Sequence, residues 1–260
     1  MEFDEFNNKI KQKQQSLTIR FKDKVVDEEL TYNIKNTTTL WRAQTLFTKE
    51  PITISWIRKF VKDKVFFDVG ANVGMYSIYA AKTSKVKVYS FEPESNNFST
   101  LIENIISNNL MGLINAYPIA ISNTSGFTSL YLSEFDTGSS HHMVDKTLDH
   151  NLREVKYKNK QGTFKSSLDE LVQNWRFPIP NYLKIDVDGI ESIIIKNSTF
   201  LLKSTQLESV LIEINRNRAE DKEIISILES IGFNYDKEQV ENSTRKSGIH
   251  EGYAEFLFYK

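Results

Sequence analysis

The sequence predicts an α/β domain built on a mainly parallel sheet with helices on both faces. From residue 65 onward, short apolar runs alternate with stretches in which apolar residues recur at helical spacing. The first apolar run stops at a glycine, as a strand that enters a tight turn does. Hydrophobic residues make up 40% and charged residues 26% of the 260-residue chain, which is ordinary globular composition. Strands that alternate with helices favour parallel pairing, because each helix carries the chain back to the same edge of the sheet.

The N-terminal residues 1–61 are expected to form a small extension, and residues 62–260 the main domain. Apolar and polar residues alternate twice within 17–34, which predicts two strands joined by a charged turn. Apolar residues at helical intervals predict a helix over 52–61. Pro51 suits the first turn of that helix, because an N–H would have no partner there.

The main domain is predicted to alternate strand and helix to its end. Strands are expected over 65–69, 86–91, 113–121, 127–132, 182–187, 210–214 and 253–259. Helices are expected over 75–82, 97–108, 168–174, 191–202 and 224–231. The polar segment 135–160 has no clear period and is expected to be irregular.

Composition and charge exclude several classes of protein. Lys and Arg total 33 against 34 for Asp and Glu, so there is no basic excess and no nucleic-acid partner is expected. The chain has no cysteine, which excludes disulfides, a thiolate nucleophile and cysteine-ligated metal. No run approaches the ~18 apolar residues of a membrane span, and the polar N-terminus is no secretory signal, so a cytoplasmic location is expected. The strand edges of the N-terminal hairpin make a homodimer one expectation.

A strand, a glycine turn and a helix follow one another between residues 65 and 82, the layout of a nucleotide-binding crossover. Its glycines are spaced G-x-x-x-G, and Asn72 stands where a dinucleotide fold needs a glycine to admit a pyrophosphate. This favours a ligand without phosphates, such as S-adenosylmethionine, whose ammonium group Asp68 could meet directly or through water. The alternative is a tight turn that binds nothing. The residues expected at this cofactor site are Asp68, Gly70, Ala71, Asn72, Gly74 and Tyr76.

Glu92 directly follows the next predicted strand and lies 18 residues after Gly74. An acid at this position can accept hydrogen bonds from both ribose hydroxyls of a bound nucleoside. The alternative is a solvated charge at a strand end. The turn and the acid together predict a nucleoside site more specifically than either does alone.

Several further segments carry a family resemblance. These are KEPITISWI at 49–57, VFFDVGANVGMYSIYAA at 65–81, FEPESNNFSTLIEN at 91–104, SLDEL at 167–171, LKIDVDGIE at 183–191 and LIEI at 211–214. In order and spacing they resemble the FkbM-type S-adenosylmethionine-dependent methyltransferases. The resemblance implies a Rossmann-like class I methyltransferase fold, with a seven-stranded sheet whose last strand is antiparallel. It also implies O-methylation of a hydroxyl on a sugar, a polyketide or a related small molecule.

The resemblance also assigns residues to the cofactor. It places Glu92 on the ribose, and Asn97 either on the ligand or as the cap of the following helix. The end of the third strand, at Ala120, falls where such folds contact adenine. Further positions of the resembling segments complete the expected cofactor set, namely Glu50, Pro93 and Asp186. Trp41 and Arg42 could cover the cofactor or pack against the N-terminal hairpin, and packing is the expected role.

Asp186 is the first candidate for catalysis, because it ends the fourth core strand at the edge of the sheet where ligands bind. An alcohol has a high pKa, so a general base or a metal must assist its methylation. Glu213 ends the neighbouring strand, and with Asp186 and His142 it forms a candidate oxygen-and-nitrogen site for Mg²⁺ or Mn²⁺. His141 and His142 are further catalytic candidates; the alternative is two exposed loop residues.

The leading interpretation is an O-methyltransferase that acts on a small hydroxyl-bearing acceptor, a sugar or sugar nucleotide for a bacterial surface polysaccharide such as a capsule. One alternative is a methyltransferase for RNA or protein, against which the lack of a basic tract argues. Another is a non-catalytic cofactor-binding protein that serves assembly. That reading predicts cofactor binding without turnover.

Overall fold

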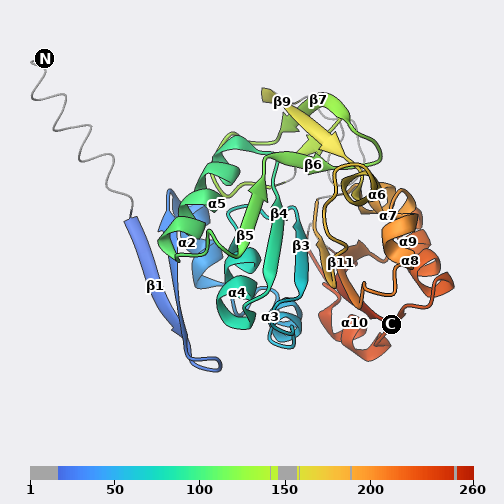
Figure 1. Cartoon of the computed structure of the whole chain (residues 1–260), viewed down its shortest axis with the longest axis horizontal. Coiled ribbons are helices and arrows are strands. Elements are labelled where there is room, and N and C mark those ends of the chain that lie inside the picture. Colours follow the sequence, from blue (N-terminus) through green and yellow to red (C-terminus); the bar gives the residue numbers. More distant parts are fainter. Residues whose placement is uncertain (1–16, 141, 146–156, 158, 188, 249–250) are drawn as a thin grey trace, which may run out of the picture.

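A seven-stranded sheet forms the centre of the computed structural model, which describes residues 17–140, 142–145, 157, 159–187, 189–248 and 251–260 (Figure 1). Its strands lie in the order β12-β13-β11-β10-β3-β4-β5. All neighbouring pairs are parallel except the two that β13 makes with β11 and β12. This confirms the expected mainly parallel sheet with an antiparallel last strand. The strands are β3 (Val65–Val69), β4 (Lys87–Phe91), β5 (Ile114–Tyr117), β10 (Tyr182–Ile185), β11 (Ser209–Asn215), β12 (Asn234–Tyr235) and β13 (Tyr253–Tyr259).

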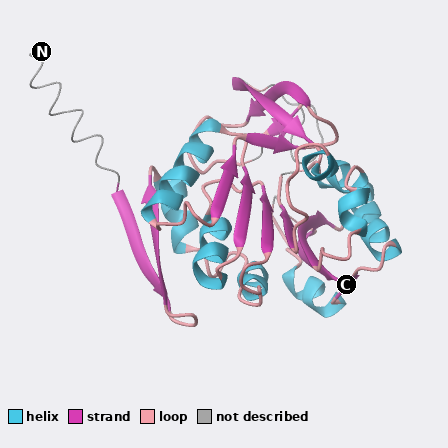
Figure 2. Cartoon of the chain, viewed as in Figure 1, coloured by secondary structure: helices cyan, strands magenta, loops and turns pink. Residues whose placement is uncertain are grey.

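Helices cover both faces of this sheet (Figure 2). Successive strand residues point to opposite faces, so Phe66 joins one hydrophobic cluster and Phe67 the other. The Phe66 face packs against α3 (Pro51–Ile57), α4 (Met75–Ser84) and α5 (Ser95–Ser107). The Phe67 face packs against α6 (Leu168–Gln173), α7 (Glu191–Lys196), α8 (Thr199–Lys203) and α9 (Ala219–Ser230), and α10 (Lys237–Ser243) contacts β13.

A second, four-stranded sheet lies beyond the ends of the main strands, where the arrowheads of β4 and β5 point in Figure 1. Its members are β6 (Ile119–Ile121), β7 (Gly126–Leu132), β8 (Met143–Val144) and β9 (Asn159–Ser166). The single strand predicted over 113–121 is therefore wrong in extent: Pro118 has no N–H for the ladder, and β5 and β6 on either side of it belong to different sheets. β8 and the start of β9 fall in the segment expected to be irregular.

The N-terminal hairpin is present as predicted, with β1 (Leu17–Asp23) antiparallel to β2 (Glu28–Ile34). It docks on the main domain, because the Tyr32 hydroxyl donates to the Met75 carbonyl oxygen at 3.0 Å and the Asn33 N–H to Asn104 Oδ1 at 2.7 Å. The division at residue 61 stays a prediction. Pro51 begins α3 as expected, whereas α2 (Thr37–Gln44) was not predicted. No helix in the described part of the chain is long and apolar enough to cross a membrane.

The predicted helix over 191–202 is also wrong in extent. It consists of α7 and α8, and Ser198 between them donates its hydroxyl to the Ile194 carbonyl oxygen at 2.7 Å. Neither α10 nor the short β12 was predicted, because both are brief and largely polar.

Candidate functional site

The first turn of the main domain brings two strands into close contact. Gly70 follows β3 with φ +79°, in the left-handed region that favours glycine. A Cβ at Gly70 would lie 1.9 Å from the carbonyl oxygen of Asp186, which follows β10. The Gly70 N–H donates to the Phe91 carbonyl oxygen on β4 at 3.0 Å. The turn therefore joins the ends of three neighbouring strands, and only a glycine fits at this position.

Glu92 lies against this turn. Its Oε2 accepts from the Asn72 N–H at 2.7 Å, and its Oε1 from the Glu94 N–H at 2.9 Å. The residue is 5% exposed, and this burial raises the pKa of Glu92 to about 7. A buried carboxylate held by two backbone N–H groups and facing a cavity is suited to accept further hydrogen bonds from a ligand.

A cavity of about 580 Å³ opens at this edge of the sheet, within the size range of small-molecule sites. Most of the residues predicted for the site line it. They are Glu50, Gly70, Ala71, Asn72, Tyr76, Glu92, Pro93, Asn97, Ala120, Asp186, Glu213 and, from the loop before β8, His142. Segments far apart in the sequence therefore meet around one space, as expected for the carboxyl ends of parallel strands.

Asp68 and Gly74 do not line the cavity. Asp68 is 1% exposed, lies opposite Lys184 in the sheet, and accepts from the Ser77 hydroxyl at 2.5 Å. Burial raises the pKa of Asp68, and the side chain points beneath the turn toward α4, so the predicted contact with a ligand's ammonium group is not supported. Gly74 has φ +84° and packs near Leu101. His141 lies outside the described residues.

Asn97 was expected to touch the ligand or cap a helix, and it does not cap α5. The cap is Glu94, whose side chain accepts from the Asn96 and Asn97 N–H groups. The Asn97 side chain instead accepts from the Gly138 N–H at 2.7 Å and donates to the Ser139 carbonyl oxygen at 3.1 Å. It thus holds the loop before β8 against the cavity.

Charged side chains gather at the other end of the cavity. Lys184 is 2% exposed, and its Nζ lies 2.8 Å from Asp186 Oδ2. Although burial opposes ionisation, Lys184 and then Lys49 hold the pKa of Asp186 well below its usual range. Asp186 is therefore an ionised carboxylate with little tendency to take up a proton.

Two further ion pairs border the same space. Lys49 Nζ lies 2.6 Å from Glu50 Oε1, and Arg245 Nη2 lies 2.8 Å from Glu213 Oε1. Burial and then Asp186 raise the pKa of Glu213 well above its usual range, against the effect of Arg245.

His142 lines the same cavity from the loop before β8. The Ser133 N–H lies 3.3 Å from its Nδ1, and the Ser139 hydroxyl lies 3.2 Å from its Nε2. Both ring nitrogens are therefore engaged within the loop, which weakens the case for His142 as a base.

The residues predicted to bind Mg²⁺ or Mn²⁺ do not fit a metal site. In the described part of the chain, no group of three or more His, Asp or Glu side chains is placed to hold an ion. Asp186 and Glu213 are each paired with a cation, and His142 is bonded to serines.

Sequence reasoning missed the cations of this site. Lys49 and Arg245 lie outside the core strands, and neither was predicted for the site. Trp41 and Arg42 line the cavity, which agrees with the less expected of their two predicted roles, covering the cofactor. Lys184 carried a usable signal, because it is a charged residue at a buried position of an apolar strand.

Comparison with known proteins identifies the family. A family model described as the methyltransferase FkbM domain matches residues 68–235. The chain belongs to this family. It is therefore a methyltransferase by descent, and the family segment contains the first turn, Glu92, Asp186 and Glu213.

Individual relatives are more distant. The hexuronic acid methyltransferase AglP of Haloferax volcanii is 25% identical over 197 residues, which cover 76% of this chain and 74% of AglP. A crystal structure of methyltransferase FkbM from Methylobacillus flagellatus KT has a TM-score of 0.48 and 14% identity over 78% of this chain, which spans only 44% of that one. The crystal structure of precorrin-6y C5,15-methyltransferase from Geobacter metallireducens has a TM-score of 0.47 and 12% identity. The match covers 84% of this chain and 91% of that one.

Proposed function

We propose that the chain transfers a methyl group from S-adenosylmethionine to an oxygen of a sugar-type acceptor. The observation that carries the proposal is a single cavity with a nucleoside-type end at Glu92 and the first turn, and a charged end at Asp186. Family membership supports methyl transfer, and the likeness to a hexuronic acid methyltransferase supports a sugar as acceptor.

The residues at the first end fit an adenosyl ligand without phosphates. The buried Glu92 carboxylate lies against the first turn at the cavity wall and can accept from ribose hydroxyls. Asn72 occupies, with its side chain, the position at which a pyrophosphate would need a glycine. S-adenosylmethionine supplies the activated methyl group when it is bound. The protein positions the two reactants and provides the electrostatic environment.

At the other end, the side chains are suited to hold a polar acceptor in line with the donor. Alignment of two reactants can lower a barrier by on the order of 7–11 kcal/mol. As the acceptor oxygen bonds to the methyl carbon, the bond from that carbon to the sulfonium sulfur breaks, S-adenosylhomocysteine leaves, and the hydroxyl proton is released to water in the cavity. The Lys184–Asp186 pair provides a fixed dipole, because Lys184 is buried and cannot exchange its partner for water. Lys49 and Arg245 line the same space.

The proposal is tested by calorimetric titration with S-adenosylmethionine and, separately, with NAD. We expect binding of the first and none of the second. Glu92→Gln should weaken S-adenosylmethionine binding about 10- to 100-fold, because a hydrogen bond to a charged group contributes roughly 1.5–3 kcal/mol. Glu103→Gln, on the outer side of α5, is the matched control and should leave the affinity unchanged.

Methyl transfer to sugars is then followed by mass spectrometry. Addition of one methyl group to a sugar oxygen is the expected result. Binding of NAD in preference to S-adenosylmethionine would refute the donor assignment, and methylation of RNA or protein with no sugar product would refute the acceptor assignment.

A further inference from the structure

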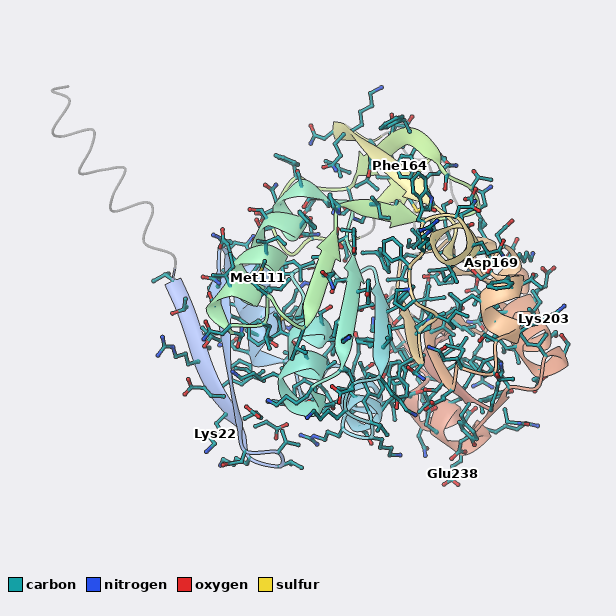
Figure 3. The ribbon with its side chains drawn as sticks, in the orientation of Figure 1. Lys22, Met111, Phe164, Asp169, Lys203 and Glu238 are labelled. Atoms are coloured by element: carbon teal, nitrogen blue, oxygen red, sulfur yellow. The ribbon has the colours of Figure 1, made fainter. Side chains whose placement is uncertain are left out.

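A second cavity lies beside the first and shares two residues with it. Its volume is about 450 Å³, within the range of ligand sites. The shared residues are Lys49 and Arg245, so two cations stand where the cavities adjoin. The other walls come from the start of α3, from α10, on which Figure 3 labels Glu238, and from β13.

Hydrogen bonds fix the backbone at both Lys49 and Arg245. The Lys49 N–H donates to the Thr45 carbonyl oxygen at 2.8 Å. The Arg245 N–H donates to the Tyr253 carbonyl oxygen at 2.9 Å, and the Gly252 N–H donates to the Arg245 carbonyl oxygen at 2.9 Å. Their side chains are each 33% exposed. The backbone of both residues is therefore held in place, while the charged ends of their side chains remain open to a ligand.

These cations have hydrogen-bond capacity left over. A lysine ammonium has three N–H donors and an arginine guanidinium five. Among the described residues, Lys49 has one carboxylate partner, Glu50, and Arg245 has one, Glu213. Although burial alone lowers the pKa of Lys49, Glu50 and Asp186 raise it overall, so Lys49 remains charged. Two charged donors with spare N–H groups are suited to a carboxylate.

The position along the sheet assigns this pair to the acceptor. Glu92 follows β4 and Gly70 follows β3, and these two residues border the proposed nucleoside end. Glu213 lies on β11, two strands beyond β3, and holds Arg245 there. An anion at Arg245 therefore lies away from the nucleoside end of the cavity.

The second cavity is lined by side chains that suit a carbohydrate. Gln239, Asn242 and Ser243 of α10 offer amide and hydroxyl groups. The Gln239 Nε2 donates to the Glu255 carbonyl oxygen at 2.9 Å, which fixes this side chain on the wall of the cavity.

We propose that Lys49 and Arg245 bind a carboxylate of the acceptor, and that the acceptor is an acidic glycan whose neighbouring sugar occupies the cavity beside α10. This inference rests on the proposed function, and it adds the charge and the length of the acceptor.

The test uses the full chain and two matched acceptors, a disaccharide that ends in glucuronic acid and the same disaccharide that ends in glucose. Arg245→Gln and Lys49→Gln are compared with Lys246→Gln, which removes an exposed charge one residue away and lines neither cavity. Binding of each sugar is measured by calorimetry on protein saturated with S-adenosylhomocysteine, and KM by methyl transfer.

We expect wild type to prefer the acidic disaccharide. Each of the two variants should lose about 10- to 100-fold in affinity for it, because a charge-assisted hydrogen bond is lost, with the neutral disaccharide and S-adenosylmethionine bound as before. Lys246→Gln should behave as wild type. Asn242→Trp, which fills the second cavity, should weaken binding of the acidic disaccharide but not of glucuronic acid alone.

Each contrary outcome has its own meaning. An equal preference for both disaccharides in wild type and variants overturns the inference and leaves the proposed function standing. Weaker S-adenosylmethionine binding in both variants, with the acid preference intact, overturns it too, because the cations would then bind the carboxylate of the donor. Failure of wild type to bind S-adenosylmethionine refutes the proposed function itself. Binding of neither sugar refutes the sugar acceptor, and with it the inference.

Discussion

Gly70→Ala is the substitution that tests most directly how the two ends of the cavity are joined. The added Cβ would lie 1.9 Å from the Asp186 carbonyl oxygen, whereas ordinary contact begins at 3.4 Å. Neither strand end can simply retreat. The Gly70 N–H is bonded to Phe91 O at 3.0 Å, and the Asp186 N–H to Val69 O at 3.1 Å.

The cost can be assembled from its parts. A left-handed backbone conformation costs a non-glycine residue roughly 1–2 kcal/mol, and overpacking against rigid atoms adds roughly 1–3 kcal/mol. We expect Gly70→Ala to lower the free energy of unfolding by about 2–5 kcal/mol, which corresponds to a fall in Tm of roughly 4–20 °C for a chain of this size.

Gly74→Ala is the matched control. Gly74 has φ +84°, so the conformational cost is the same, but the atom in the way is Leu101 Cδ1, at 2.3 Å, the end of a flexible side chain. We expect a fall of only about 1–2 kcal/mol. Thermal unfolding followed by circular dichroism compares the two. Equal destabilisation by both substitutions would refute the reasoning, because it would mean that the contact with Asp186 can relax freely.

Two further predictions concern ionisable groups. Burial raises the pKa of Glu92 to about 7 in the folded chain, so the folded state binds this proton more tightly than the unfolded state does. The added stability is therefore present at low pH and is lost as pH rises toward 7. Ribose hydroxyls donate to the ionised form of Glu92, so the affinity for S-adenosylmethionine should rise with pH, at most about tenfold per pH unit, and level off above about pH 7. Calorimetry from about pH 5.5 to 8.5 measures this affinity. An equal rise of affinity with pH in Glu92→Gln would contradict the prediction. Lys184→Met removes a buried partner of Asp186 and should cost about 3–5 kcal/mol at neutral pH. The loss should shrink at lower pH, where Asp186 can then be protonated, and urea unfolding that shows a pH-independent loss would argue against this pairing.

Sequence reasoning could place the site because parallel strands end at one edge of the sheet. The residues after β3, β4 and β10 are the predicted Gly70, Glu92 and Asp186, and all three line the cavity. The same argument does not hold for Asp68, which was also predicted to contact the ligand. Strand alternation puts Asp68 on the face of Phe66, directed at Ser77 of α4, so a residue one position before the strand end points away from the ligand edge.

The remaining residues of the site could not be placed from periodicity. Arg245 reaches the cavity from a loop after α10, and Lys49 from the turn after α2, neither of which has a strand or helix pattern that fixes its direction. Their positions depend on tertiary contacts, such as the backbone hydrogen bonds of Arg245 with Tyr253 and Gly252. The polar strand β9 was missed for a related reason, because only two of its eight residues are buried.

Asn72 shows why the missing glycine of the first turn is informative. It has φ +50°, which asparagine tolerates better than most residues, so the turn keeps a glycine-like backbone while it gains a side chain. That side chain donates to the Ser139 carbonyl oxygen at 2.8 Å, and the Asn72 N–H donates to Glu92 at 2.7 Å. Asn72 thus links the first turn to Glu92 and to the loop before β8. A backbone N–H that is already bonded to a carboxylate is not available to a phosphate, and the adjacent carboxylate would repel one. The asparagine side chain fills the place that a glycine would leave open, and the bonded N–H and the nearby carboxylate both disfavour a phosphate there, which supports a phosphate-free donor at this end of the cavity.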